Sequence, residues 1–117
     1  MRTSDKILNP SLKKEIENTF AQTIADLKDI SEAKTFLKDF FNESENEAFA
    51  KRLAVAYWLR KKRSYNNIKE NLKVSSATIA SVQSMMEKPG FKLALKKIEA
   101  EEWASKWAEK IKKFVKQ

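Results

Sequence analysis

The chain has 117 residues and a formal net charge of +8, and it contains no cysteine and no histidine. These absences exclude a disulfide, a thiolate nucleophile, an imidazole base and an ordinary zinc site, and a single glycine excludes a phosphate-binding loop of the P-loop kind. One glycine and two prolines also provide too little turn chemistry for tight hairpins, so we expect a single all-α domain over residues 1–117, with no enzymatic activity and no cofactor or metal.

The two halves of the chain carry opposite charge. Residues 1–50 hold 7 basic and 10 acidic side chains, a net charge of −3, whereas residues 51–117 hold 17 and 6, a net charge of +11. Such asymmetry favours a polyanionic partner for the second half, although a lysine-rich solvated surface would have the same composition. The N-terminus lacks the apolar run of a signal peptide and no stretch is apolar enough to span a bilayer, which indicates a cytoplasmic protein.

Apolar residues spaced by three or four predict two helices in the first forty residues. The first follows Asn9-Pro10-Ser11, with Asn9 or Ser11 as its cap, and extends to about Lys28. The second is short and begins with Ser31 as its cap.

A third helix is predicted to begin at a capping box formed by Ser44 and Glu47. Its apolar stripe follows Phe49, Leu53, Ala56 or Tyr57, and Leu59 or Arg60. The run Arg60-Lys61-Lys62-Arg63 ends this helix. It suits the negative end of the helix dipole, and it could equally hold phosphates beside the next element.

Residues 64–88 predict a helix-turn-helix. A short helix, Tyr65 to Leu72 with Ser64 as cap, is followed by a tight break and a helix from Ser76 to about Lys88. We expect the two helices to pack through their apolar residues, with Ser75 capping the second helix and small polar residues on its outer face. The alternative is a plain helical hairpin inside a core. The apolar residues expected to pack between the two helices of the motif are Ile68, Leu72, Val74, Ile79 and Val82. Pro89-Gly90 ends the segment, and Phe91 begins a long last helix.

Four segments carry a resemblance to a known family: residues 49–56, residues 64–68, residues 74–79 and residues 90–95. Together they resemble the tryptophan repressor superfamily, and most closely its repressor-like branch of YerC/YecD type, over roughly residues 36–98. The resemblance implies an intertwined homodimer with two helix-turn-helix heads. Residues 10–62 would form the dimerisation helices, residues 64–88 the helix-turn-helix, and residues 91–117 a basic C-terminal helix.

The resemblance implies a transcriptional regulator that binds double-stranded DNA in the major groove. No arginine or asparagine lies on the outer face of the second helix, so we expect sequence preference to depend on DNA shape or on water. The residues expected to face bases are Ser76, Ala77, Thr78, Ala80 and Ser81. Those expected near phosphates are Lys61, Lys62, Arg63, Asn66, Lys69 and Lys73, of which Asn66 follows from the family pattern alone.

The family's tryptophan pocket uses two arginines that enclose the indole ring. Arg52 matches the first, whereas the second position is Ser81, so we expect no tryptophan response and leave any effector unassigned. Arg52 could instead pair with Glu45 or Glu47. Lys73 stands where a glycine would relieve a left-handed turn, at a cost of about 1 kcal/mol.

Two alternatives compete with DNA binding. One is a helical adaptor whose charge serves solubility, or which binds a protein partner through its aromatic C-terminal helix. The aromatic residues as a set are compatible with a dimer interface or with monomeric packing: Phe20, Phe36, Phe40, Phe41, Trp58, Trp103 and Trp107. The basic tail could lie on an anionic membrane through Lys106, Lys110, Lys112, Lys113 and Lys116. Three acidic residues interrupt that tail, Glu101, Glu102 and Glu109, so we expect no membrane partner.

Overall fold

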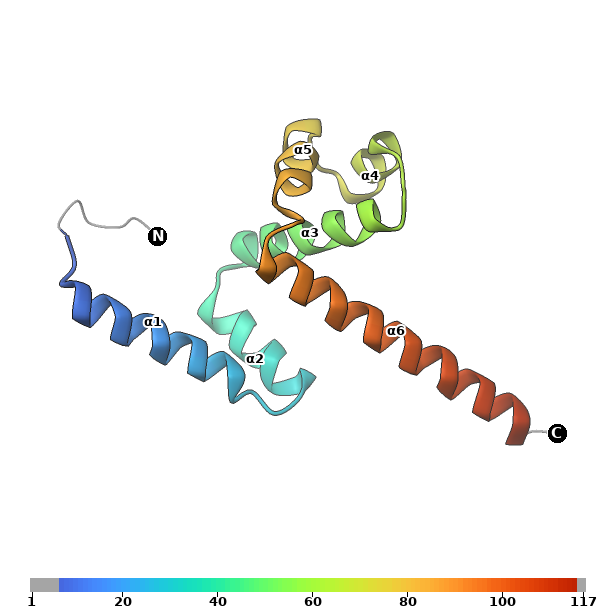
Figure 1. Cartoon of the computed structure of the whole chain (residues 1–117), viewed down its shortest axis with the longest axis horizontal. Coiled ribbons are helices and arrows are strands. Elements are labelled where there is room, and N and C mark those ends of the chain that lie inside the picture. The colour runs from blue at the N-terminus through green and yellow to red at the C-terminus, as the bar shows by residue number, and fades with distance from the viewer. Residues whose placement is uncertain (1–6, 116–117) are drawn as a thin grey trace. The chain divides into compact units, whose positions relative to one another are not determined.

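The computed structural model describes residues 7–115, with side chains for residues 7–106 and 109, and in this part of the chain every regular element is an α-helix. The all-α prediction is therefore confirmed. Among the described residues, no helix is long and apolar enough to cross a membrane. The helices are α1 (Pro10–Ala25), α2 (Ile30–Phe40), α3 (Glu43–Arg60), α4 (Tyr65–Leu72), α5 (Ser76–Met85) and α6 (Pro89–Val115) (Figure 1).

The chain divides into two compact units, Met1–Asn46 and Glu47–Gln117, and the boundary lies within α3. The expected single domain, with its segments 10–62, 64–88 and 91–117, stays a prediction. The first unit holds α1 and α2, and the second holds most of α3 together with α4, α5 and α6.

Side-chain caps set the starts of α1 and α2. The Asn9 side chain accepts from the backbone N–H groups of Ser11, at 2.9 Å, and Leu12, at 3.1 Å, so Asn9 is the cap of α1. Asp29 caps α2 by accepting from the backbone N–H of Glu32 at 2.9 Å. The expectation that Ser31 caps α2 is wrong, because the Asp29 carboxylate already serves the free N–H groups and Ser31 lies inside the helix.

The cap of α3 also differs from expectation. Asn42 accepts from the backbone N–H of Glu45 at 2.8 Å, and the Glu45 carboxylate accepts from the backbone N–H of Asn42 at 2.9 Å. This is a reciprocal capping box, but it lies two residues before the predicted pair Ser44 and Glu47. Asn42 outcompetes Ser44 because it precedes the helix, whereas Ser44 is already helical.

The first unit has an aromatic cluster but no buried residue in either helix. The rings of Phe36 and Phe40 stack with centroids 4.8 Å apart, and Phe20 stacks on Phe40 at 5.4 Å. The ring of Phe41 meets Phe40 edge-on at 5.3 Å. Along α1, an apolar stripe remains exposed by about two fifths to one half: Leu12, Ile16, Phe20 and Ile24. α1 ends at Ala25, slightly before the expected Lys28.

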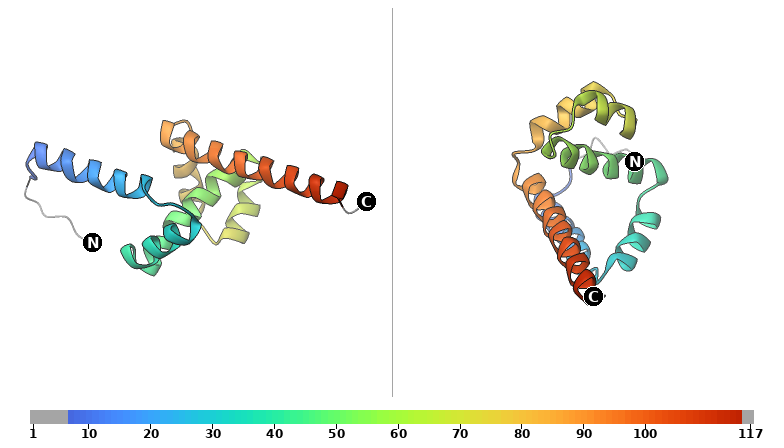
Figure 2. Two further views of the ribbon diagram at one scale, coloured as in Figure 1. Left: turned by 90° about the horizontal axis from the view of Figure 1, so that it is seen from below. Right: turned by 90° about the vertical axis from the view of Figure 1, so that its right-hand side faces the viewer.

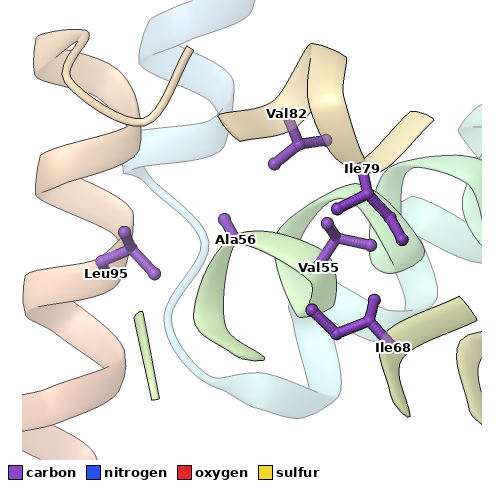
Figure 3. Packing of buried hydrophobic residues seen from close by; sticks show 6 residues of the cluster. All are labelled: Val55, Ala56, Ile68, Ile79, Val82 and Leu95. Carbon is purple, nitrogen blue, oxygen red and sulfur yellow. The ribbon is translucent and has the colours of Figure 1, made fainter. Parts of the chain in front are cut away.

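The second unit has one core, drawn in Figure 3, to which α3, α4, α5 and α6 all contribute. Its fully or nearly fully buried residues are Val55, Ala56, Ile68, Ile79, Val82 and Leu95. The predicted α3 stripe is only partly correct, because Phe49 and Leu53 are 43% and 38% exposed while Val55 is fully buried. The reason is that α4 and α5 cover the Val55 side of α3: Figure 3 shows Val55 directed toward Ile68 and Ile79.

The connection into α6 lies earlier in the chain than expected. α5 ends at Met85 rather than Lys88, and α6 begins at Pro89 rather than Phe91. Proline at the first position of a helix loses no hydrogen bond and has a suitable φ. The Pro89-Gly90 pair, which was expected to lie between two helices, is therefore the start of α6.

The second half of α6 extends away from α3, α4 and α5, as Figures 1 and 2 show. Two ion pairs link its earlier part to the end of α3: Arg60 Nε to Glu99 at 2.9 Å and Lys61 Nζ to Glu102 at 3.2 Å. Trp103 is 64% exposed. The side chains of Trp107, Lys110, Lys112 and Lys113, and all of Lys116, lie outside the described part.

Candidate nucleic-acid interface

The helix-turn-helix forms as the sequence predicts. The Ser64 side chain caps α4 by accepting from the backbone N–H of Asn67 at 3.1 Å, and Ser75 caps α5 by accepting from Thr78 at 3.1 Å. Between them Lys73 has φ 55° and ψ 52°, the left-handed turn that was expected at this position. The carbonyl of Lys73 accepts from Lys51 Nζ at 3.4 Å, so α3 supports the turn from beneath.

The inner faces of α4 and α5 hold the motif together. Ile68, Ile79 and Val82 are buried, and Leu72 and Val74 are partly buried and pack against them. The predicted packing is confirmed. This contact orients α5 because Ile79 and Val82 face the core and leave the opposite face of the helix in solvent.

The outer face of α5 presents small and polar side chains. All five residues predicted to face bases are exposed: Ser76, Ala77, Thr78, Ala80 and Ser81. The Thr78 hydroxyl lies 3.0 Å from that of Ser75, so Thr78 also supports the cap. A helix start with such short side chains has no steric obstacle to lying against a flat or grooved polar surface.

The segment from Lys61 to Met86 is strongly cationic, with five basic residues and one acidic residue, Glu70. Lys62, Lys69 and Lys73 are exposed, and none pairs with a carboxylate among the residues that the structure describes. Asn66 is exposed beside them on α4. A positive surface therefore adjoins the outer face of α5.

Two of the side chains predicted to contact phosphates, Arg63 and Lys61, interact with neighbouring residues of the chain. The Arg63 guanidinium lies 4.0 Å above the Trp58 ring and donates through Nη1 to Asn67 at 3.2 Å, which fixes its position at the start of α4. Lys61 pairs with Glu102 on α6. A carboxylate already neutralises Lys61, so it is less available to a phosphate than its neighbours are.

A hydrogen bond that the sequence does not predict links the two helices of the motif. The Tyr65 hydroxyl, at the start of α4, donates to Oε1 of Gln83, near the end of α5. The two residues are eighteen positions apart, so no local pattern indicates their contact. The bond joins the ends of α4 and α5 that lie away from the turn.

Arg52 lines an open pocket of about 410 Å³ in the second unit. Apolar side chains from α3 and α6 form its walls, and Lys88 provides a second cation. Arg52 lies 5.6 Å from the Phe49 ring centroid. The alternative of an ion pair with Glu45 or Glu47 is wrong within the described residues, because Glu45 caps α3 and Glu47 pairs with Lys51 at 3.3 Å.

Comparison with known proteins agrees with this architecture. Residues 15–99 match the family model described as Trp repressor protein. An uncharacterized protein of Bacillus subtilis, YerC, is 31% identical over 94 residues, which cover 79% of this chain and 89% of that protein. The crystal structure of a TrpR-like protein from Eubacterium eligens superposes with a TM-score of 0.70 at 30% identity, covering 78% of this chain and 96% of that one. With a helix-turn-helix among the six helices of its described part, the chain belongs to the Trp repressor family.

Proposed function

We propose that this protein is a transcriptional regulator that binds double-stranded DNA as a homodimer, with α5 entering the major groove. One observation carries the proposal: α5 is held by Ile79 and Val82, so that its small, polar outer face projects from a cationic surface. A helix of this kind fits the groove, and the surrounding lysines suit the phosphates on either side.

The proposed contacts divide into two groups. Short side chains on α5 approach the base edges, and their lack of bidentate donors makes DNA shape and bridging water the main source of sequence preference. Exposed cations on α4 and in the flanking turns contact phosphates. The base-facing residues are Ser76, Ala77, Thr78, Ala80 and Ser81; the phosphate contacts are Lys62, Arg63, Asn66, Lys69 and Lys73, with Lys61 contributing only when it leaves Glu102.

The test is a fluorescence-anisotropy titration of duplex DNA at several salt concentrations, with duplexes chosen from a random pool by repeated selection on the protein. Each phosphate contact contributes about 0.9 to the slope of log K against log salt. Lys69→Gln and Lys73→Gln should each lower that slope by about 1.8 in a dimer, since two copies are lost. Lys34→Gln on α2, an exposed lysine outside the cationic segment, is the matched control.

A slope near zero, or equal slopes for all three variants, would refute a phosphate-based interface. In that case the adaptor interpretation gains support if shortening the chain before Trp103 abolishes binding to a protein partner.

Tryptophan is not expected to be the effector. The family's tryptophan pocket encloses the indole between two arginines. Only Arg52 is present here, and the short side chain of Ser81, on the exposed outer face of α5, cannot replace the second guanidinium. Isothermal titration calorimetry with L-tryptophan should therefore give no heat at micromolar concentrations. A saturable micromolar isotherm would overturn this expectation.

A further inference from the structure

A second pocket, which shares no residue with the Arg52 pocket, lies where the ends of α3 and α5 meet the start of α6. Its volume is about 500 Å³, within the range of pockets that bind small molecules. Leu59, Met86 and Leu95 contribute apolar surface, and Leu95 is only 2% exposed. An occupant could therefore bury a hydrocarbon or ring portion against the core.

The polar groups of this pocket are mainly donors. Lys62, at its margin, has no carboxylate partner among the described residues. Arg60 uses Nε for Glu99, and a guanidinium has further N–H groups on its terminal nitrogens. Gln83 accepts from Tyr65 through Oε1, which leaves its amide N–H groups for another partner.

The acceptor in the pocket is already engaged. Glu87 pairs with Lys92 at 3.1 Å, so the carboxylate that lines the pocket is balanced by a cation that lines it too. The groups that remain are mainly donors: the terminal N–H groups of Arg60, the ammonium of Lys62 and the amide N–H groups of Gln83. Unmet donors beside apolar surface favour a ligand that combines a negative group with an apolar body.

The backbone at Lys62 forms the left-handed turn that commonly ends a helix, and this turn places the lysine at the pocket. Lys62 has φ 65°, in the left-handed region that disfavours residues with a Cβ. Two hydrogen bonds maintain the turn, from Lys62 N–H to the Leu59 carbonyl at 3.0 Å and from Arg63 N–H to the Trp58 carbonyl at 3.1 Å. Glycine or asparagine would fit this turn with less strain, yet the position carries a lysine that lines the pocket.

From these observations we propose that the pocket between α3, α5 and α6 binds a small organic anion: an apolar body bearing a carboxylate or a phosphate. Lys62, Gln83 and Arg60 hold the negative group, and Leu59, Met86 and Leu95 contact the body. The site lies beside Gln83 and Met86 at the end of α5, so its occupant touches both the helix-turn-helix and α6. The proposal does not depend on DNA binding.

The experiment is a titration of the full chain followed by ¹⁵N–¹H correlation spectra. The probes are phenyl phosphate and phenylacetate, which present the two possible negative groups on one ring. Inorganic phosphate provides the charge without the ring, and benzyl alcohol provides the ring without the charge. At least one aromatic anion should shift the amide signals of Lys62, Gln83 and Met86, with a Kd at least tenfold below those of inorganic phosphate and benzyl alcohol.

Two variants test the contribution of Lys62. Lys62→Asn removes the charge while allowing the left-handed turn, and it should weaken binding of the preferred anion at least fivefold. Lys34→Gln removes an exposed lysine on α2 that does not line the pocket, and it should leave the Kd unchanged. The proposal is overturned if no probe shifts these signals, if inorganic phosphate binds as tightly as the aromatic anions, or if Lys62→Asn binds like the unaltered protein.

Discussion

Lys73 is the residue at which stability and the proposed function conflict most directly. Its left-handed backbone, φ 55° and ψ 52°, is required by the turn between α4 and α5. A residue with a Cβ is strained there, whereas glycine is not. The exposed lysine side chain adds positive charge next to the start of α5, which the proposed phosphate contacts would use.

Lys73→Gly should therefore raise the free energy of unfolding by about 1 kcal/mol per protomer and at the same time weaken DNA binding. Urea denaturation followed by circular dichroism measures the first effect, and the anisotropy titration measures the second. Lys69→Gly is the control, since glycine inside α4 should lower stability by about 1 kcal/mol. If Lys73→Gly loses stability, the left-handed turn is not the source of strain.

At the scale of single residues, the sequence predicted some roles and missed others. The caps Ser64 and Ser75 were predicted, and Asn9 was one of two candidates with Ser11, because a cap bonds to a backbone only two or three residues away. Ser31 and Ser44 were wrongly chosen, since several polar residues precede each helix and their backbone conformations decide between them.

The start of α5 is the element on which the proposed interface depends. Ser75 accepts from the N–H of Thr78, and its hydroxyl also lies 3.0 Å from that of Thr78. Serine and aspartate are both good caps, but only aspartate adds negative charge. This difference allows the stability of α5 to be separated from its proposed contact with DNA.

Ser75→Ala should lower the free energy of unfolding by about 1 kcal/mol per protomer, because an N-cap hydrogen bond is lost. Ser75→Asp should keep that stability, yet it should weaken DNA binding at least tenfold, because a carboxylate would face the phosphates. Urea denaturation and the anisotropy titration give the two readouts. Full DNA affinity in Ser75→Asp would place the interface elsewhere on the protein.

Pairing between elements was less predictable than the elements themselves. The periodicity of α3 identified a helix and the buried Ala56, but it placed Phe49 and Leu53 inside and left out Val55, which is fully buried. Likewise, the sequence predicts the same phosphate contact for Lys61 and Lys62. Only the position of α6 gives Lys61 a carboxylate partner, Glu102. Both outcomes depend on residues far along the chain.

For the whole molecule, the notable feature of the first unit is its exposed apolar surface. α1 and α2 contain no buried residue, and their exposed side chains include Ile16, Phe20 and Phe40. Contiguous apolar surface of this kind marks an interface between proteins. We expect a second copy of the chain to cover it in the proposed homodimer.

Ile16→Asp should convert the dimer to a monomer, because a carboxylate at the centre of the α1 stripe would lose its hydration on association. Light scattering after size-exclusion chromatography should then give 13.6 kDa instead of twice that mass. Asn18→Asp adds a negative charge on the opposite side of the same helix and should leave the dimer intact. A dimeric mass for Ile16→Asp would show that this face of α1 takes no part in the interface.

The sequence by itself determined the helices, the helix-turn-helix with its two serine caps and its left-handed lysine, and the family. The helices and the motif depend on side-chain periodicity and on hydrogen bonds between residues at most four positions apart, which the order of residues sets directly. The family was indicated by four short segments of the sequence. Only the tertiary structure decided which side of α3 enters the core, that Lys61 is paired with Glu102, that Tyr65 reaches Gln83, and that donors gather around a pocket beside Leu95. These contacts join residues from separate helices, and their geometry follows from how the helices pack.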